Sequence, residues 1–281
     1  MTNTLKKILI ATTVVAFTAC GGGSSDTSNP ISNPSAGADG GASSSGTRLK
    51  SSKIVTDNFE NYVEYTYDGN KVISSKGTTK INSELNETET TTWEYKNNQV
   101  VKLIFKQYEP NKTLKMTTTK VITYDGKKRP YKDVTKSVQG TKTEIYTETS
   151  IEKTKWEGRY PTEEKMNMFM SGVKWVDRIW TVKIDNDRVE SLNTQDILHT
   201  YTYDDQDRKD PLFYLLQGDT EKYGESELTH HRYLITNTEL KNIADNKIKN
   251  EKKQYEFNTL GLVIKETLKN GMMLIYEYEE F

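Results

Sequence analysis

The sequence predicts an all-β fold in which tandem hairpins build an antiparallel sheet, extended or partly closed, with one or two short helices. Aromatic and aliphatic residues alternate with polar ones at a period of two, as along Phe59, Val63, Tyr65 and Tyr67. Such runs end in turns like Asp68-Gly69-Asn70, whose residues tolerate the positive φ of tight hairpins. Apolar residues at helical spacing are scarce.

Residues 1–19 have the three parts of a signal peptide. Lys6 and Lys7 make the positive start, and residues 8–17 form an apolar run of about ten residues, short of the ~20 that a spanning helix needs. Ala19 is the small residue at the cleavage site. We therefore expect this segment to be removed.

The only cysteine of the chain, Cys20, follows directly. Phe17-Thr18-Ala19-Cys20 resembles the bacterial lipobox, in which the cysteine is acylated and becomes the mature N-terminus. The resemblance implies lipidation of Cys20 and anchoring in a lipid bilayer, because several acyl chains attach a protein stably. Gly21 resembles the sorting pattern for the outer membrane, where the domain would face the periplasm or the cell surface.

Residues 20–50 then predict a lipidated cysteine and a disordered tether. Gly, Ser, Ala and Asn dominate, with Pro30 and Pro34, so the segment has too little apolar surface to offset the entropy of ordering. A flexible coil of this length spans about 30 Å on average. Residues 51–281 are expected to fold as a β-rich domain of hairpin repeats.

The predicted strands of this domain recur with polar turns between them. The pattern reappears before the turns at 97–98, 125–126, 185–187, 204–205 and 258–261. Trp180, Val182 and Ile184 share one face of their strand. In the last hairpin, Asn270-Gly271 as a two-residue turn predicts pairing of Leu268 with Met273.

Several strand–turn units resemble Tyr-Asp (YD, Rhs-like) repeats. They are Tyr65-Thr66-Tyr67-Asp68-Gly69-Asn70, Tyr201-Thr202-Tyr203-Asp204-Asp205 and Tyr255-Glu256-Phe257-Asn258. The units are most similar to those of lipoproteins of unknown function in which they build an extended antiparallel sheet. The resemblance implies no catalytic residues.

Three stretches carry helix signals. Pro161 to Met170 begins with a proline and acidic residues, which suit a helix N-terminus. Asp210 to Leu216 is a second candidate. Glu239 to Lys249 places apolar residues at helical spacing, but is equally readable as a polar connection.

No metal or cofactor is expected. His230 and His231 lie near Glu225 and Glu227, but adjacent residues of a strand point to opposite faces and do not bind one ion. His199 would be a third ligand only by chance of folding. The acidic stretches 204–207, with Asp210, and 185–187 lack the glycine and glutamate of an EF-hand loop and are read as solvated turns.

The function predicted is a non-catalytic binding or scaffold role at the cell envelope. No nucleophile elbow, phosphate loop or dinucleotide motif is present. The 39 basic and 40 acidic residues nearly balance, which argues against nucleic-acid binding. The alternative is a β-fold hydrolase acting on envelope or extracellular glycan, through carboxyls that the sequence does not single out.

The aromatic residues allow two interpretations. They build either the core of the domain or a face that binds a protein or glycan partner. The core is favoured for any one of the tryptophans, which are Trp93, Trp156, Trp175 and Trp180.

Overall fold

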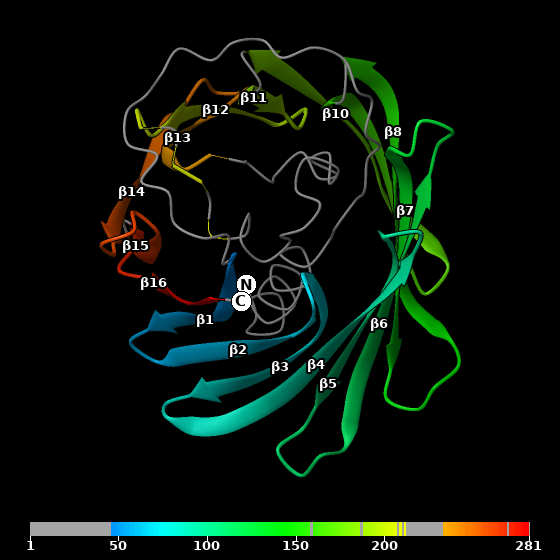
Figure 1. Ribbon diagram of the computed structural model, residues 1–281. Helices are drawn as coiled ribbons and strands as arrows, with labels where there is room; N and C mark the ends of the chain where they lie inside the picture. The colour runs from blue at the N-terminus through cyan, green and yellow to red at the C-terminus, as the bar shows by residue number, and fades with distance from the viewer. Residues whose placement is uncertain are drawn as a thin grey trace.

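A computed structural model describes residues 46–157, 160–185, 188–206, 208–209, 211, 233–268 and 270–280 of the chain. These residues form sixteen β-strands, arranged as a ring in Figure 1. The strands are β1 (Thr47–Thr56), β2 (Phe59–Asp68), β3 (Lys71–Ile81), β4 (Glu84–Lys96), β5 (Gln99–Tyr108), β6 (Leu114–Tyr124), β7 (Pro130–Gln139), β8 (Ile145–Glu157), β9 (Tyr160–Met170), β10 (Val173–Asp185), β11 (Arg188–Asn193), β12 (Ile197–Tyr203), β13 (Ile235–Asn242), β14 (Ile248–Phe257), β15 (Val263–Leu268) and β16 (Met273–Glu280).

The sheet is a closed antiparallel barrel in which each strand pairs with the next one along the chain. β1 pairs with β16, from Thr47 opposite Glu280 to Val55 opposite Met273. The all-β antiparallel prediction is confirmed, whereas the extended or partly closed form is wrong. Hairpin signals are local, and the pairing that closes the barrel joins the two ends of the domain, so no local pattern predicts it.

The helix predictions are wrong wherever the described residues test them. Pro161 to Met170 lies in β9, which is hydrogen-bonded to β8 and β10. Glu239 to Lys249 contains the end of β13, a turn and the start of β14. Pairing on both sides outweighs the weak helix signals. The stretch Asp210 to Leu216 lies outside the described residues, apart from Pro211.

None of the helical structure in the described part of the chain is long and apolar enough to cross a membrane.

β1 begins at Thr47, within the segment expected to be tether. The described fold therefore starts slightly before residue 51.

The last hairpin forms one residue out of the predicted register. Thr267, not Leu268, lies opposite Met273. The loop is longer than two residues, because the Leu268 N–H donates to the Met272 carbonyl and the Gly271 N–H donates to the Leu268 carbonyl. Gly271 has a φ of 81°, so the positive φ that the sequence indicated sits at the end of a longer loop.

The sheet has a buried face and an exposed face. On β3 the buried Gly77 and the exposed Lys76 are neighbours, and Gly77 lies opposite the buried Glu89 of β4. Leu234, which precedes β13, is fully buried in one cluster with Trp93 of β4. Because β13 and β4 lie on well-separated parts of the closed ring, this cluster lies in the interior of the barrel. The buried face is therefore the inner wall of the barrel, and the exposed face is its outer face.

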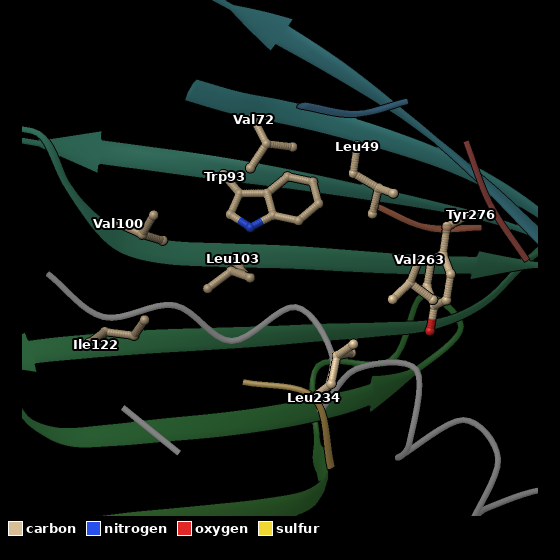
Figure 2. Close-up of a cluster of buried hydrophobic side chains, with 9 residues drawn as sticks. All are labelled: Leu49, Val72, Trp93, Val100, Leu103, Ile122, Leu234, Val263 and Tyr276. Carbon is tan, nitrogen blue, oxygen red and sulfur yellow. The ribbon is translucent and has the colours of Figure 1, made fainter. Parts of the chain in front are cut away.

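Two apolar clusters lie on the inner wall. The larger one joins β1, β3–β6, β15 and β16 with Leu234, and Figure 2 shows Leu234 on the same side of the strands as Trp93 and Val263. The smaller one contains Val182, Val189 and Leu192, with Trp180 and Ile184 packed against it. The shared face predicted for Trp180, Val182 and Ile184 is thus confirmed.

Candidate functional site on the inner wall

A repeated tyrosine contact ties the strands together at one end of the barrel. This end carries the turns that follow even-numbered strands, and we call it the tyrosine rim. Near the end of an even-numbered strand, a tyrosine hydroxyl donates to a carbonyl close to the start of the preceding strand, over 2.5–2.8 Å. The pairs are Tyr67 to Leu49, Tyr95 to Val72, Tyr124 to Val100, Tyr203 to Val189, Tyr255 to Ile235 and Tyr278 to Val263.

Basic side chains lie over several aromatic rings at this rim. The Arg48 guanidinium is 4.3 Å from the centre of the Tyr67 ring, and Lys71 lies 5.6 Å from that of Tyr95. Arg208 covers Phe257 at 3.8 Å. Arg48 and Lys71 stand at the start of a strand and Arg208 follows β12, and each lies over an aromatic ring near the end of an even-numbered strand. No local sequence pattern indicates these contacts, because the partners lie well apart along the chain.

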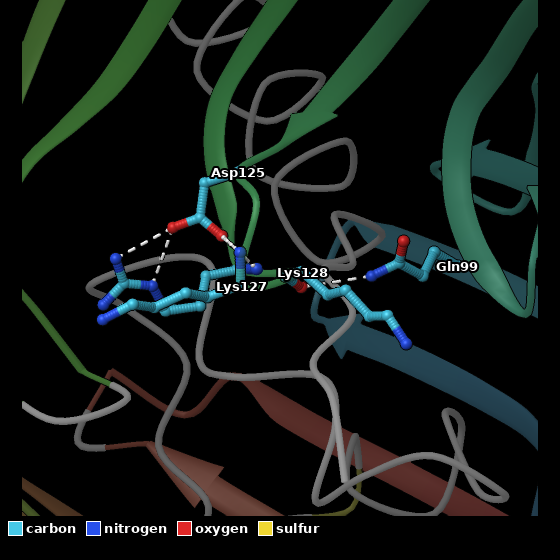
Figure 3. Close-up of polar contacts among 5 residues, drawn as sticks. Gln99, Asp125, Lys127 and Lys128 are labelled. Carbon is cyan, nitrogen blue, oxygen red and sulfur yellow. Dashed lines mark hydrogen bonds and ion pairs between the residues drawn. The ribbon is translucent and has the colours of Figure 1, made fainter. Parts of the chain in front are cut away.

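Three turns at the tyrosine rim are closed by an acidic or amide side chain. The Asp125 carboxylate accepts bonds from the backbone N–H groups of Lys127 and Arg129 and from the Arg129 side chain. Figure 3 shows Asp125 facing its own loop, and Gln99 reaching the Lys128 carbonyl from the neighbouring strand. Burial opposes ionisation of Asp125, but the hydrogen bonds from Arg129 and Lys127 outweigh it and lower its pKa.

Asp204 closes its turn in the same way as Asp125 does. Its carboxylate accepts from the backbone N–H groups of Gln206 and Arg208 and from the Arg208 side chain. Asn258 uses its amide oxygen to accept from Leu260 and Leu262. The sequence predicts a solvated acidic turn here, whereas Asp204 is only 8% exposed and its carboxylate closes the turn.

The tyrosine contact is replaced on β8 and β10. At the matching ends of these strands stand Trp156, which Arg129 covers at 4.2 Å, and Ile184. The two apolar clusters of the described residues draw nothing from β7, β8 or β9. This sector of the wall is therefore held by other means.

Buried charges hold the β6–β9 sector. The Lys120 ammonium is 3.6 Å from the Asp133 carboxylate, and the Lys153 ammonium is 3.5 Å from Asp133 and 3.9 Å from Glu164. The four side chains come from four successive strands and are at most 8% exposed. Removing one member of such a buried set leaves an uncompensated charge, which costs about 3–5 kcal/mol.

A second polar group lies on β2–β4. Burial raises the pKa of Glu89 to about 7, and the hydrogen bond from Asn61 only partly offsets this. Asn61 also donates to the Thr79 hydroxyl at 3.0 Å. Glu87, two residues before Glu89 on the same face, is paired with Lys115 and Gln107. Two carboxyls on one strand thus have different environments.

The remaining predicted candidates do not converge on one point. His199 lies on β12 and stacks on Tyr201, with ring centres 6.4 Å apart, and desolvation lowers its pKa. Cys20, His230, His231 and the acids near them lie outside the described residues, as do residues 186–187. Among the described residues, no group of three or more His, Cys, Asp or Glu side chains is placed to hold a metal ion.

The tryptophans divide between the two interpretations. Trp93 is 5% exposed and belongs to the core, as predicted, whereas Trp175 is 64% exposed. Trp175 lies near the start of β10, beside Val173, which is 67% exposed. Both lie toward the end of the barrel opposite the tyrosine rim.

Comparison with known proteins adds a likeness of shape. No known protein family and no curated protein matches the chain. A porin-like protein from Bacteroides uniformis ATCC 8492 has 12% identity and a TM-score of 0.37, covering 82% of this chain and 98% of its own. One from Bacteroides vulgatus ATCC 8482 has 10% identity and a TM-score of 0.43, covering 83% and 99%. The described strands define a sixteen-stranded, closed antiparallel barrel protein.

Proposed function

We propose that this chain is an outer-membrane lipoprotein, held by acylated Cys20, whose barrel stands in water. The barrel acts as a binding or scaffold unit without catalytic activity. The observation that carries the proposal is the charge on the outer face of the barrel. The lipobox-like residues before Cys20 support the anchor.

Oppositely charged residues lie directly opposite each other on the outer face. Glu94 and Lys102 are 2.8 Å apart, and the same arrangement recurs across other strand pairs. The further pairs are Lys132–Glu152, Lys136–Glu148 and Lys265–Glu256. A barrel that spans a membrane presents an apolar band about 25 Å tall, and a basic residue at its middle costs about 2–4 kcal/mol. The paired charges support an outer face that meets water.

Barrel closure limits how a partner can bind. Strand addition needs an edge strand with unpaired backbone groups, but each described strand has a neighbour on both sides. We therefore place the contact with a protein or glycan partner at the exposed Trp175, not at a sheet edge. The tyrosines of the tyrosine rim stabilise the barrel wall, because their hydroxyls donate hydrogen bonds to backbone carbonyls.

Fractionation of cells that express wild type and Cys20→Ala tests the anchor and the aqueous barrel together. We expect wild type in the outer-membrane fraction and the alanine variant among the proteins released when the envelope is opened. Retention of the folded variant in the membrane would contradict a barrel held only by lipid. Protease shaving of intact cells then decides between the periplasmic and the surface-facing orientation.

A photo-crosslinking residue in place of Trp175 tests the binding role. We expect a discrete crosslinked product in intact cells, and none from a matched probe at Thr92, which lies exposed on the outer face of β4. Equal crosslinking from both positions would count against a partner site at Trp175.

The alternative is a hydrolase acting on envelope or extracellular glycan, and Glu87 and Glu89 favour it. A general acid needs a carboxyl with a raised pKa, as burial gives Glu89, and a second carboxyl near it. The binding proposal predicts no turnover of envelope glycan by purified protein. Turnover that is lost in both Glu87→Gln and Glu89→Gln would instead support the hydrolase.

A further inference from the structure

Three methionines line the inner wall of β9. Met166, Met168 and Met170 alternate with Asn167 and Phe169, so the strand periodicity puts the three thioethers on one face. This face also carries Glu164, which is 1% exposed. The methionines themselves are half-buried. A helix, as predicted from the sequence, would have placed Met166 and Met170 on one face and turned Met168 away from them.

We propose that this row binds a soft monovalent cation, Cu⁺ or its analogue Ag⁺. Thioether sulfur is a soft, neutral ligand that selects Cu⁺ among the biological metals. Ca²⁺ and Mg²⁺ require oxygen ligands, and Zn²⁺ prefers thiolate or imidazole. The row offers sulfur alone, and the proposal does not depend on the lipid anchor.

The residues across from the methionines leave the thioethers as the only soft donors. On β8 the partners are Ile151, Thr149 and Thr147, and on β10 they are Arg178, Val176 and Val173. These six residues include no carboxylate, histidine or cysteine. Their one charge, on Arg178, is balanced by the Asp196 carboxylate at 2.9 Å. A single positive ion can therefore approach the row, most readily beside Met168 and Met170.

The spacing of the row suits a shared ion. Residues two apart on a strand are separated by about 6.6–6.8 Å. An ion midway between two of them therefore lies about 3.4 Å along the strand from each. The methionine side chain has three rotatable bonds and a polarizable sulfur, so two neighbouring thioethers can turn toward that point. The pairing of β9 on both sides keeps the row in place.

Titration of the purified full-length Cys20→Ala chain, which lacks the thiol that would itself bind Ag⁺, tests the site by calorimetry with Ag⁺ in chloride-free buffer. We expect one ion bound per chain, and at least tenfold weaker binding after Met166→Leu, Met168→Leu and Met170→Leu are combined. The matched variant Met272→Leu/Met273→Leu, which removes two methionines at the last hairpin, should bind as wild type does. Competition for Cu⁺ against a coloured chelator, carried out under oxygen-free conditions, should rank the affinities of wild type and the variants in the same order.

Absence of binding by wild type, or equal binding by the triple variant, would overturn the site. Leucine conserves the volume of methionine, and thermal melts check that the variants fold. Should the triple variant fail to fold, wild type labelled at the methionine methyl groups decides by NMR. The chain has seven methionines, so their signals can be assigned through single variants. Ag⁺ shifts confined to Met166, Met168 and Met170 support the proposal, and shifts only elsewhere reject it.

Discussion

At the scale of single residues, buried polar side chains decide how the inner wall behaves. Glu89 lies beneath its neighbours with an exposure of 7%, and burial raises its pKa to about 7 from 4.5. The folded protein therefore holds this proton more tightly than the unfolded chain does. The contribution of Glu89 to the free energy of unfolding is fully present below about pH 4.5 and is lost as pH rises through about 7.

Glu89→Gln should remove this pH dependence. The free energy of unfolding of wild type should fall by up to about 3 kcal/mol between pH 4.5 and pH 8 through this group, since one pKa unit corresponds to about 1.36 kcal/mol. The amide keeps the shape of the side chain without the charge. Urea unfolding at several pH values measures the difference, and parallel curves for the two proteins would contradict it.

Tyr95→Phe should lower the free energy of unfolding by about 1 kcal/mol, the net value of a typical hydrogen bond. It removes the hydroxyl that donates to the Val72 carbonyl at 2.8 Å. Tyr62→Phe is the matched control, because Tyr62 is partly exposed on β2 and a surface substitution changes stability by about 0.5 kcal/mol or less. Equal effects of the two changes in urea unfolding would show that the rim hydroxyls are not specific ties.

At the scale of elements, the barrel wall has two kinds of sector. Around β1–β6 and β14–β16, apolar side chains and the tyrosine contacts pack the inner wall. Across β6–β9, the buried charges of Lys120, Asp133, Lys153 and Glu164 take their place. Neighbouring strands in the first kind of sector also fit each other sterically, as β3 and β4 do at Gly77.

Gly77→Ala should destabilise the β3–β4 pair by about 1–3 kcal/mol, the usual effect of overpacking. A Cβ at this position would lie 2.5 Å from Glu89 Oε1 and 2.6 Å from its Cγ, so the buried side chain would have to move. In a Glu89→Ala background the penalty should largely disappear. Denaturant unfolding of the four proteins gives the coupling energy, and additive effects would contradict the contact.

At the scale of the whole molecule, closure is the property that distinguishes this chain from an open hairpin array. Thr47 of β1 and Glu280 of β16 lie opposite each other at the tyrosine rim. Closure pairs the backbone groups that edge strands would otherwise leave open to aggregation. It also brings the first and last strands to the same place, which allows the chain to be reconnected.

A circular permutant tests closure. Residues 1–46 would be joined to 98–280, followed by a short Gly/Ser linker and residues 47–97. We expect it to fold with the circular dichroism spectrum and cooperative melting of wild type, because the joined ends are neighbours and the new opening is the turn at Asn97-Asn98. The matched control omits β15 and β16 and should aggregate. Aggregation of both would indicate that the ends are far apart.

The hairpins were predictable because their signals are local. Alternation placed the strand containing Trp180, Val182 and Ile184. The core interpretation, favoured for each tryptophan, holds for Trp93 but not for Trp175, which is 64% exposed. The candidate site was less predictable. Lys153 and Glu164 look like any surface pair in a chain with 40 acids, and their burial depends on β7–β9 lying side by side. The local signals around the Met166–Met170 segment indicate a helix, whereas pairing with β8 and β10 makes it part of strand β9.

The sequence alone determined that this protein is built from antiparallel hairpins whose turns open with Asp or Asn, since alternation and turn chemistry act over a few residues. Tertiary structure alone decided that β1 pairs with β16, that charged side chains such as Lys153 and Asp133 are buried on the inner wall, and that three methionine thioethers face inward. Each of these depends on contacts between strands, whose partners no local pattern specifies. The physical reason is that strand pairing and burial are set by neighbours brought together only when the barrel closes.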